Sequence, residues 1–376
     1  MKILLIASLA DSLINFRCSL ISALKDKGLE VHIAAPDLPP SSPVLLRLQA
    51  MGLTVHQVPM SRTGVNPLAD LRTVWVLWRL MRLISPHLVL SYTIKPVIYG
   101  TLAAWMARVP KRFALITGLG YAFQGSGERN CLRALVYRLY SSALVRAHLV
   151  FFQNPDDLDL FKKCNILHAS TSVCIVNGSG VDLASFTERP LPVAALAGAV
   201  RFLLIGRLLG DKGVREYVQA ARILKRSHPQ VQCAIVGWID SNPNAITQNE
   251  LEGWVADGSI EFLGRLDDVR AALESCSVYV LPSYREGTPR SVLEAMAIGR
   301  AIVTTDAPGC RETVVDGDNG YLVPVQDAVA LAKAMARFID EPTLQTSMGR
   351  RSRQMAEVKY DVHMVNAVMM KGMGVE

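Results

Sequence analysis

The stretch Glu286-Gly287-Thr288-Pro289-Arg290-Ser291-Val292-Leu293-Glu294 comes a few residues after the strand-like run Val278–Leu281. Thr288 is suited to a helix N-cap and Pro289 to the first helical position, so we expect a helix to begin here. A strand that leads into a helix in this way is typical of α/β sheets. The amides at the N-terminus of such a helix can bind an anion, typically a phosphate.

The same stretch carries two carboxylates. Glu286 would lie in the loop and Glu294 about a turn and a half into the helix, so both could face one bound molecule. Carboxylates accept hydrogen bonds from the hydroxyls of a sugar or ribose. The alternative interpretation is a surface loop followed by a capped helix, which requires no ligand.

A second motif, Gly206-Arg207-Leu208-Leu209-Gly210-Asp211-Lys212-Gly213, directly follows the apolar run Val200–Ile205. It is not a Walker loop, because the Gly-Lys-Ser/Thr ending is missing. Arg207 and Lys212 at the carboxyl end of a strand suit a diphosphate, since arginine offers a fork of donors and lysine a point charge. A glycine-rich turn with solvated charges is the alternative.

Short apolar runs alternate with helical patterns along the whole chain, which favours an α/β fold of doubly wound parallel sheets. The runs expected to be strands are Lys2–Ala7, Glu30–Ala35, Leu53–Gln57, Leu88–Ser91, Arg112–Ile116, Leu149–Phe152, Ser172–Val176, Val200–Ile205, Val231–Val236, Ile260–Leu263, Val278–Leu281, Ala301–Thr304 and Gly320–Val323. The first of them also has the outline of a signal peptide, but the helical pattern and strand that follow favour a buried strand.

The proline-bearing stretch Glu188–Pro192 interrupts the alternation. We therefore expect two Rossmann-like domains, residues 1–188 and 189–376, with a helical segment at about 344–370 as a candidate to pack back on the first domain. Open α/β sheets bind ligands beyond the carboxyl ends of their strands, so two such domains facing each other would form one cleft.

The charge is divided unevenly. Residues 1–183 contain 19 Lys and Arg against 10 Asp and Glu, whereas the remaining residues contain 21 against 23, so the net charge of +7 is the sum of +9 and −2. The basic residues are dispersed among apolar ones without a nucleic-acid-binding motif, so we expect no nucleic-acid partner.

No stretch reaches the ~18–20 uncharged apolar residues of a membrane-spanning helix. A helix expected at Leu68–Ile84 combines Trp75 and Trp78 with three basic residues, Arg72, Arg79 and Arg82. The tryptophans either pack in the core or belong to an interfacial helix on an anionic membrane surface.

The sequence contains no His-Glu-x-x-His motif, and no Asp-x-Asp directly follows an expected strand. We expect no metal and no cofactor, with cationic side chains and a helix N-terminus stabilising the developing charge.

Together, the two motifs resemble the nucleotide-sugar domain of the GT-B glycosyltransferases, in particular retaining family 4. The resemblance covers most of the chain. It continues through Leu281–Gly287, Leu293–Ala297, Ile302–Asp306, Asp316–Gly320 and Asn177–Asp182.

The resemblance implies a set of donor-site roles. Arg207 and Lys212, beside Gly206, would bind the donor diphosphate and stabilise the leaving nucleotide. Glu286 would lie near the donor sugar and Glu294 would hold the ribose. Two backbone segments would complete the site: Gly287, Thr288 and Pro289 against sugar and phosphate, and Gly264 to Val269 along the base. Glu286, Arg207 and Lys212 would be the catalytic residues.

For the first domain, the resemblance implies acceptor binding. The candidates are Asn15, Arg17, Thr93, Lys95 and Gly118. The segments that contain them resemble those of the family 4 branch that acts on polyprenyl-diphosphate-linked sugars, such as the bacillosaminyl N-acetylgalactosaminyltransferases. Two features depart from the pattern. Ser8–Ser12 replaces a glycine-rich loop, and Ile94 stands where a histidine is often found.

The function implied is retaining transfer of a hexosyl or N-acetylhexosaminyl group from a UDP-sugar to a lipid-diphosphate-linked saccharide. It would take place in bacterial glycan assembly, on the inner face of the cell membrane. Two alternatives are a nucleotide-sugar epimerase of the same fold and a non-enzymatic saccharide-binding protein. A nicotinamide dehydrogenase is disfavoured, because Gly118-x-Gly120 lacks the third glycine of the dinucleotide fingerprint.

Overall fold

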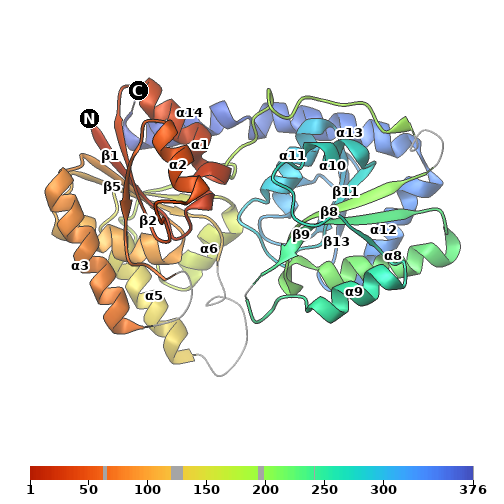
Figure 1. Ribbon diagram of the computed structural model, residues 1–376, viewed down its shortest axis with the longest axis horizontal. Helices are drawn as coiled ribbons and strands as arrows, with labels where there is room; N and C mark the ends of the chain where they lie inside the picture. The colour runs from red at the N-terminus through yellow and green to blue at the C-terminus, as the bar shows by residue number, and fades with distance from the viewer. Residues whose placement is uncertain (62–65, 120–129, 194–198, 241, 376) are drawn as a thin grey trace. The chain divides into compact units, whose positions relative to one another are not determined.

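The structure, a computed structural model, describes residues 1–61, 66–119, 130–193, 199–240 and 242–375. The chain divides into two compact units. The first unit is Met1–Ser179 together with His363–Glu376, and the second unit is Gly180–Val362. Both are parallel α/β sheets flanked by helices (Figure 1).

The first unit contains a seven-stranded sheet in the order β3-β2-β1-β4-β5-β6-β7. Its strands are β1 (Lys2–Ile6), β2 (Glu30–Ala35), β3 (Thr54–Gln57), β4 (Leu88–Tyr92), β5 (Lys111–Ile116), β6 (Leu149–Phe152) and β7 (Val173–Ile175). All neighbours pair in parallel. The order reverses between β1 and β4, which makes their carboxyl ends the switch point where such sheets bind ligands.

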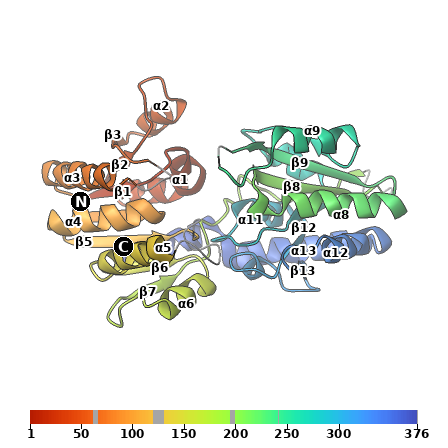
Figure 2. The ribbon, with the colours of Figure 1, turned by 90° about the horizontal axis from the view of Figure 1, so that it is seen from below.

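Helices cover both faces of this sheet (Figure 2). They are α1 (Asp11–Asp26), α2 (Pro43–Ala50), α3 (Pro67–Ile84), a π-helical turn (Pro96–Gly100), α4 (Thr101–Met106), α5 (Asn130–Leu144), α6 (Pro155–Lys163) and α14 (Val362–Met373). Because side chains alternate along a strand, Ile3 and Leu5 of β1 pack with α1 and α14, whereas Leu4 and Ile6 pack with α3 and α4.

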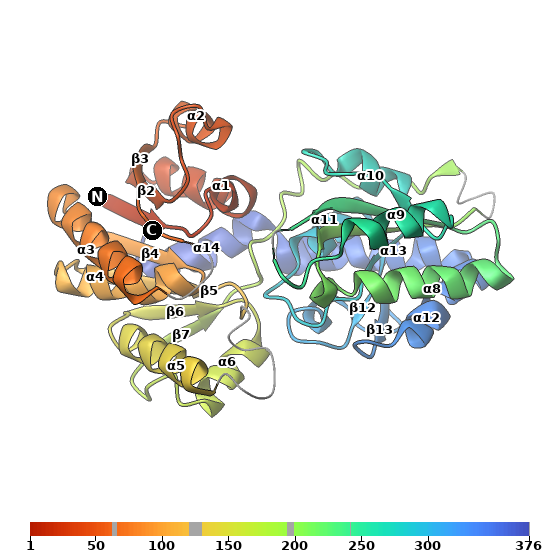
Figure 3. The same cartoon turned by 60° about the horizontal axis from the view of Figure 1, so that its bottom comes forward.

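The second unit contains a six-stranded sheet in the order β10-β9-β8-β11-β12-β13 (Figure 3). Its strands are β8 (Arg201–Leu208), β9 (Gln232–Ile239), β10 (Glu261–Phe262), β11 (Val278–Leu281), β12 (Ala301–Thr305) and β13 (Gly320–Val323). Its helices are α8 (Val214–Ser227), α9 (Gln248–Ala256), α10 (Arg270–Ser275), α11 (Arg290–Ile298), α12 (Ala328–Asp340) and α13 (Thr343–Met355), with short turns at Gly210–Lys212, Arg311–Thr313 and Ala356–Tyr360. The switch point here lies between β8 and β11.

The expected fold class, two doubly wound parallel sheets, is confirmed. The division of the chain differs in detail from the expected boundary at residue 188, because the second unit begins at Gly180. The expected terminal helix at 344–370 is interrupted, since α13 packs in the second unit and α14 in the first. No helix in the described ranges is long and apolar enough to cross a membrane.

Candidate functional site

The segment after β8 is shaped by Gly213. This residue has φ +68°, and a Cβ atom there would lie 2.1 Å from the carbonyl oxygen of Pro282. Only glycine tolerates both the left-handed backbone and this close approach. The turn that carries Lys212 therefore lies directly against the segment that follows β11, and the amide of Tyr284 donates to the carbonyl of Asp211 at 2.9 Å.

Two expectations about these segments are wrong in detail. Gly206 and Arg207 do not follow the strand but belong to it, because β8 continues to Leu208 and pairs with β9 along its full length. Thr288 is not the N-cap of α11. Pro289 has the extended ψ of 111° that places it at the N-cap, so the helix begins at Arg290 and no side chain caps it.

Lys212 and Glu286 form an ion pair, Nζ to Oε1, between the turn after β8 and the loop before α11. Ser283 Oγ donates to the same carboxylate oxygen at 2.7 Å. The loop is fixed from behind, because the amide of Glu286 donates to the carbonyl of Pro308 at 2.9 Å. At Gly309, with φ +80°, a Cβ atom would lie 2.2 Å from the Glu286 carbonyl oxygen. The Glu286 carboxylate is therefore held rigidly at the uncapped N-terminus of α11.

Glu294 lies on α11 and is buried. Its Oε1 accepts from Arg290 Nε at 2.7 Å. Burial raises the pKa of the Glu294 carboxyl, with a further small increase from the charge of Asp268, while Arg290 acts in the opposite direction. A buried carboxylate beside one arginine retains acceptor capacity for further hydrogen bonds, as ligand hydroxyls could supply.

Arg207 is paired with Asp240, whose Oδ2 accepts from the Arg207 guanidinium at 2.9 Å. The side chain of Asp240 is only 8% exposed. Sequence reasoning missed this residue, because it ended the strand at Val236, whereas β9 reaches Ile239 and places Asp240 directly at the strand end. The signal in the sequence for Asp240 was an isolated aspartate four residues after the expected strand end at Val236.

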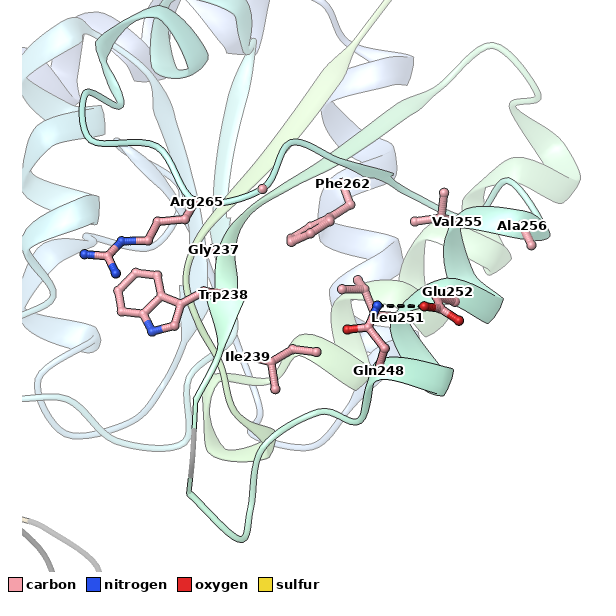
Figure 4. A pocket seen from close by; sticks show the side chains of 11 residues that line it. Gly237, Trp238, Ile239, Gln248, Leu251, Glu252, Val255, Ala256, Phe262 and Arg265 are labelled. Carbon is pink, nitrogen blue, oxygen red and sulfur yellow. Dashed lines mark hydrogen bonds between the residues drawn. The ribbon is translucent and has the colours of Figure 1, made fainter.

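The segment Gly264–Val269, expected to line a base, begins at a cavity of about 540 Å³. Gly264 and Arg265 line the cavity together with apolar side chains of β9, β10 and α9 (Figure 4). The Arg265 guanidinium lies 4.9 Å from the ring centre of Trp238, on the neighbouring strand end. Val269, at the other end of the segment, packs against the core of the second unit.

In the first unit, Thr93 and Ser8 meet at the switch point. Their hydroxyl oxygens are 2.7 Å apart, which joins the carboxyl ends of β4 and β1. Thr93 has φ +69°, a conformation that is strained for a β-branched residue. Such strain occurs preferentially at functional sites.

The other acceptor candidates of the first unit lie on α1 and in the segments that follow β4 and β5. Arg17 is buried, with its guanidinium 5.3 Å from the ring centre of Tyr92, whereas Asn15 is exposed. Lys95 is paired at 2.9 Å with Asp70 of α3. Gly118 has φ +113° and follows β5, while Gly120 lies outside the described residues.

The described residues contain no group of three or more His, Cys, Asp or Glu side chains placed to hold a metal ion. In the site of the second unit, Arg207, Lys212 and Arg290 each face a carboxylate.

Comparison with known protein families agrees with this architecture. Residues 2–154 match the model described as glycosyl transferase 4-like, and residues 196–355 match glycosyl transferases group 1. The chain belongs to the GT-B glycosyltransferases. The two matches cover both sheets of this glycosyltransferase except β7, and the second match contains Arg207, Lys212, Glu286 and Glu294.

Relatives of full length are bacterial glycosyltransferases. The N,N'-diacetylbacillosaminyl-diphospho-undecaprenol alpha-1,3-N-acetylgalactosaminyltransferase of Campylobacter jejuni is 28% identical over 97% of this chain and 96% of its own. The capsular polysaccharide biosynthesis glycosyltransferase CapM of Staphylococcus aureus is 22% identical over 92% of this chain and 90% of its own.

Solved structures share the fold. HepE of Anabaena, in complex with UDP and glucose, superposes with a TM-score of 0.77 at 17% identity, covering 100% of this chain and 99% of its own. Sucrose-phosphate synthase of Thermosynechococcus elongatus gives a TM-score of 0.79 at 19% identity, covering 99% and 98%.

Proposed function

We propose that this glycosyltransferase moves a hexosyl or N-acetylhexosaminyl group, with retention of configuration, from a UDP-sugar to a lipid-diphosphate-linked saccharide in bacterial glycan assembly. The observation that carries the proposal is the Lys212–Glu286 ion pair at the uncapped N-terminus of α11. It puts a cation, helix amides and a carboxylate next to each other, as a sugar diphosphate requires. Support for the acceptor class comes from the Campylobacter jejuni relative, whose name specifies a diphospho-undecaprenol substrate.

In this proposal, Arg207 and Lys212 bind the donor diphosphate. Both are now paired with carboxylates, Asp240 and Glu286, so binding exchanges one anionic partner for another. The exchange leaves Glu286 beside the donor sugar, where it orients the hydroxyls. Charge-assisted hydrogen bonds of this kind contribute about 1.5–3 kcal/mol each.

Other parts of the second unit recognise the rest of the donor. The buried Glu294 accepts hydrogen bonds from the ribose, and the backbone at Gly287, Thr288 and Pro289 lies against sugar and phosphate. The segment Gly264–Val269, at the cavity next to Trp238, lines the base. UDP occurs in the structural neighbour HepE and is the nucleotide we propose here.

The reaction needs orientation and charge stabilisation more than a catalytic dyad. The acceptor hydroxyl attacks the sugar on the face from which the nucleotide leaves, through an oxocarbenium-like transition state. The leaving diphosphate accepts the hydroxyl proton, and Arg207, Lys212 and the α11 N-terminus stabilise its charge. These positive groups take the place of a metal ion, and no cofactor takes part.

The first unit binds the acceptor. We assign this role to Asn15, Arg17, Thr93, Lys95 and Gly118, of which the strained Thr93 lies at the switch point of the sheet. An acceptor with a polyprenyl chain stays in the bilayer, so the enzyme acts on the inner face of the cell membrane, attracted by anionic lipid.

The decisive experiment is a nucleotide-release screen over UDP-, GDP- and ADP-sugars, with and without a lipid-linked acceptor. We expect UDP release that requires the acceptor and persists in EDTA. Conversion of the sugar nucleotide without an acceptor would identify an epimerase instead. Loss of activity in EDTA with recovery in Mg²⁺ or Mn²⁺ would contradict the metal-independent mechanism.

A further inference from the structure

The outer face of α3 is apolar and basic. Leu68, Leu71, Trp75 and Leu83 are 81%, 66%, 51% and 80% exposed. The exposed basic residues Arg72, Arg79 and Arg82 recur on the same face at helical spacing. The opposite face of α3 is already buried in the core of the first unit through Leu77 and Met81. The exposed apolar side chains are therefore additional to those that the fold needs.

A cavity of about 680 Å³ adjoins this face, where α3 lies beside α4 (Figure 2). Its lining consists of Trp75, Trp78, Arg79, Arg82, Met106 and Arg108. The Arg79 guanidinium lies 5.5 Å from the ring centre of Trp75. In the described part of the chain, no carboxylate pairs with any of the three arginines. The cavity thus gathers three cations and two indoles without a counter-charge.

Arg108 contributes to this cavity from a strained position. It follows α4 with φ +60°, at the helix end where glycine is the usual residue. Its amide donates to the carbonyl of Trp105, and the amide of Val109 donates to Ala104, which fixes the turn. A long cationic side chain is therefore retained at a position whose backbone favours glycine.

The surrounding sequence has the same charge bias. From Leu71 to Pro155 the chain contains eleven Lys and Arg residues and a single acidic residue, Glu128, which lies outside the described part. At the cavity itself, Arg79, Arg82 and Arg108 would attract an anionic ligand. An amphipathic helix with arginine and tryptophan on its outer face is suited to the membrane interface.

We propose that the α3–α4 cavity binds the phosphate of an anionic membrane lipid headgroup, while Leu68, Leu71 and Trp75 enter the interface beside it. The inference rests on the proposed function only in placing the enzyme at a membrane. The cavity is distinct from the acceptor candidates, because Arg82 is twelve residues along α3 from Asp70, the partner of Lys95. Twelve helical residues correspond to roughly 18 Å.

Vesicle flotation tests the proposal with two charge-matched double variants. Arg79→Glu with Arg82→Glu alters the cavity, whereas Lys162→Glu with Lys163→Glu makes the same change of charge on exposed residues of α6. On vesicles of phosphatidylcholine with phosphatidylglycerol, we expect the first pair to weaken binding roughly tenfold or more and the second to leave it within about twofold. Equal weakening by both pairs would overturn the cavity as the site.

Arg108→Gly separates binding from folding. It removes a cavity guanidinium and gives the backbone its preferred residue, so we expect weaker vesicle binding with an unchanged or raised melting temperature. Unchanged binding would contradict the proposal. In a second arm without vesicles, inorganic phosphate is compared with chloride at equal ionic strength, and the readout is the part of the tryptophan fluorescence change that is lost in Trp75→Phe with Trp78→Phe. A phosphate-specific change, together with vesicle binding that the cavity variants leave unchanged, would identify a free-phosphate site and overturn the lipid assignment.

UDP affinity, measured by calorimetry, distinguishes this inference from the proposed function. The cavity variants should bind UDP as the parent protein does, since Arg79, Arg82 and Arg108 all lie in the first unit. Vesicle binding by a protein that shows no sugar transfer would support the cavity and contradict the proposed reaction. Sugar transfer by a protein that does not bind anionic vesicles would support the proposed reaction and contradict the cavity as a lipid site.

Discussion

Lys212 and Glu286 are joined by an ion pair although 74 residues separate them in the chain. The pair links the turn after β8 to the loop before α11, and the two side chains are only 19% and 13% exposed. The backbone that carries each side chain is fixed by a glycine. The left-handed Gly213 fixes the turn of Lys212, and the contact with Gly309 fixes the loop of Glu286. The cation and the carboxylate are therefore preorganised before any ligand arrives.

Glu286→Ala should reduce turnover by about 10²-fold or more while UDP still binds. Removing a preorganised contact to the transition state costs about 2.7–4 kcal/mol. Steady-state kinetics and UDP calorimetry on the same variant provide the measurement. Ser283→Ala is the matched control, because it removes only the neutral donor to the same carboxylate oxygen, and should cost much less. A folded Glu286→Ala enzyme with near parental turnover would disprove the role.

Arg207→Ala and Lys212→Ala should each weaken UDP binding and slow transfer. Each change removes a charge-assisted contact of about 1.5–3 kcal/mol, which corresponds to roughly 10- to 150-fold in affinity. Arg222→Ala removes an exposed arginine of α8 that pairs with Asp257, and it should leave UDP affinity unchanged. If calorimetry gave the same small effect for all three variants, the diphosphate would not lie at β8.

Asp240→Asn should strengthen UDP binding several-fold. In the unliganded protein, the Asp240 carboxylate occupies the Arg207 guanidinium that we assign to the diphosphate. The amide keeps the shape of the side chain but removes its negative charge, so it competes less with phosphate. Calorimetry measures the change in UDP affinity. When Arg207→Ala is already present, adding Asp240→Asn should give no further gain in affinity. Weaker binding by Asp240→Asn alone would show that Asp240 orients Arg207 instead.

Glu294→Gln should change the pH dependence of stability. Burial raises the pKa of Glu294 above its ordinary 4.5, so the folded protein holds this proton more tightly than the unfolded chain. Its contribution to stability is complete below about pH 4.5 and is lost as the pH rises through the folded-state pKa. The advantage of the parent protein over Glu294→Gln should therefore shrink from acidic to neutral pH. Urea unfolding across that range checks this, and a growing advantage would contradict it.

Much of the fold could be predicted from the sequence, because parallel strands buried on both faces are continuous apolar runs. The runs at Glu30–Ala35, Leu149–Phe152, Val278–Leu281 and Gly320–Val323 match the observed strands residue for residue. Strand ends were less predictable. Gly206 and Arg207 disfavour a strand locally, yet pairing with Gly237 and Trp238 extends β8 through them.

The candidate site was predictable only in part. Spacing along the chain predicted Glu286 in the loop before α11 and Glu294 on that helix, but whether they bind a donor sugar stays a prediction. The partners Asp240 and Asp70 were missed, because Arg207–Asp240 and Lys95–Asp70 are contacts between different elements that no local pattern encodes. The donor and acceptor roles of the remaining residues stay predictions that the variants above address.

Helix α14 determines whether the first unit can be produced as a separate fragment. Met369 and Met373 are fully buried in the core of the first unit, although they stand at the other end of the chain. Each contributes roughly 1.5–3 kcal/mol of hydrophobic burial. A fragment ending at Ser179 would expose the groove that these methionines fill, and we expect it to aggregate. Separate production of this unit therefore needs the last residues fused or added back as a peptide, as in a split protein.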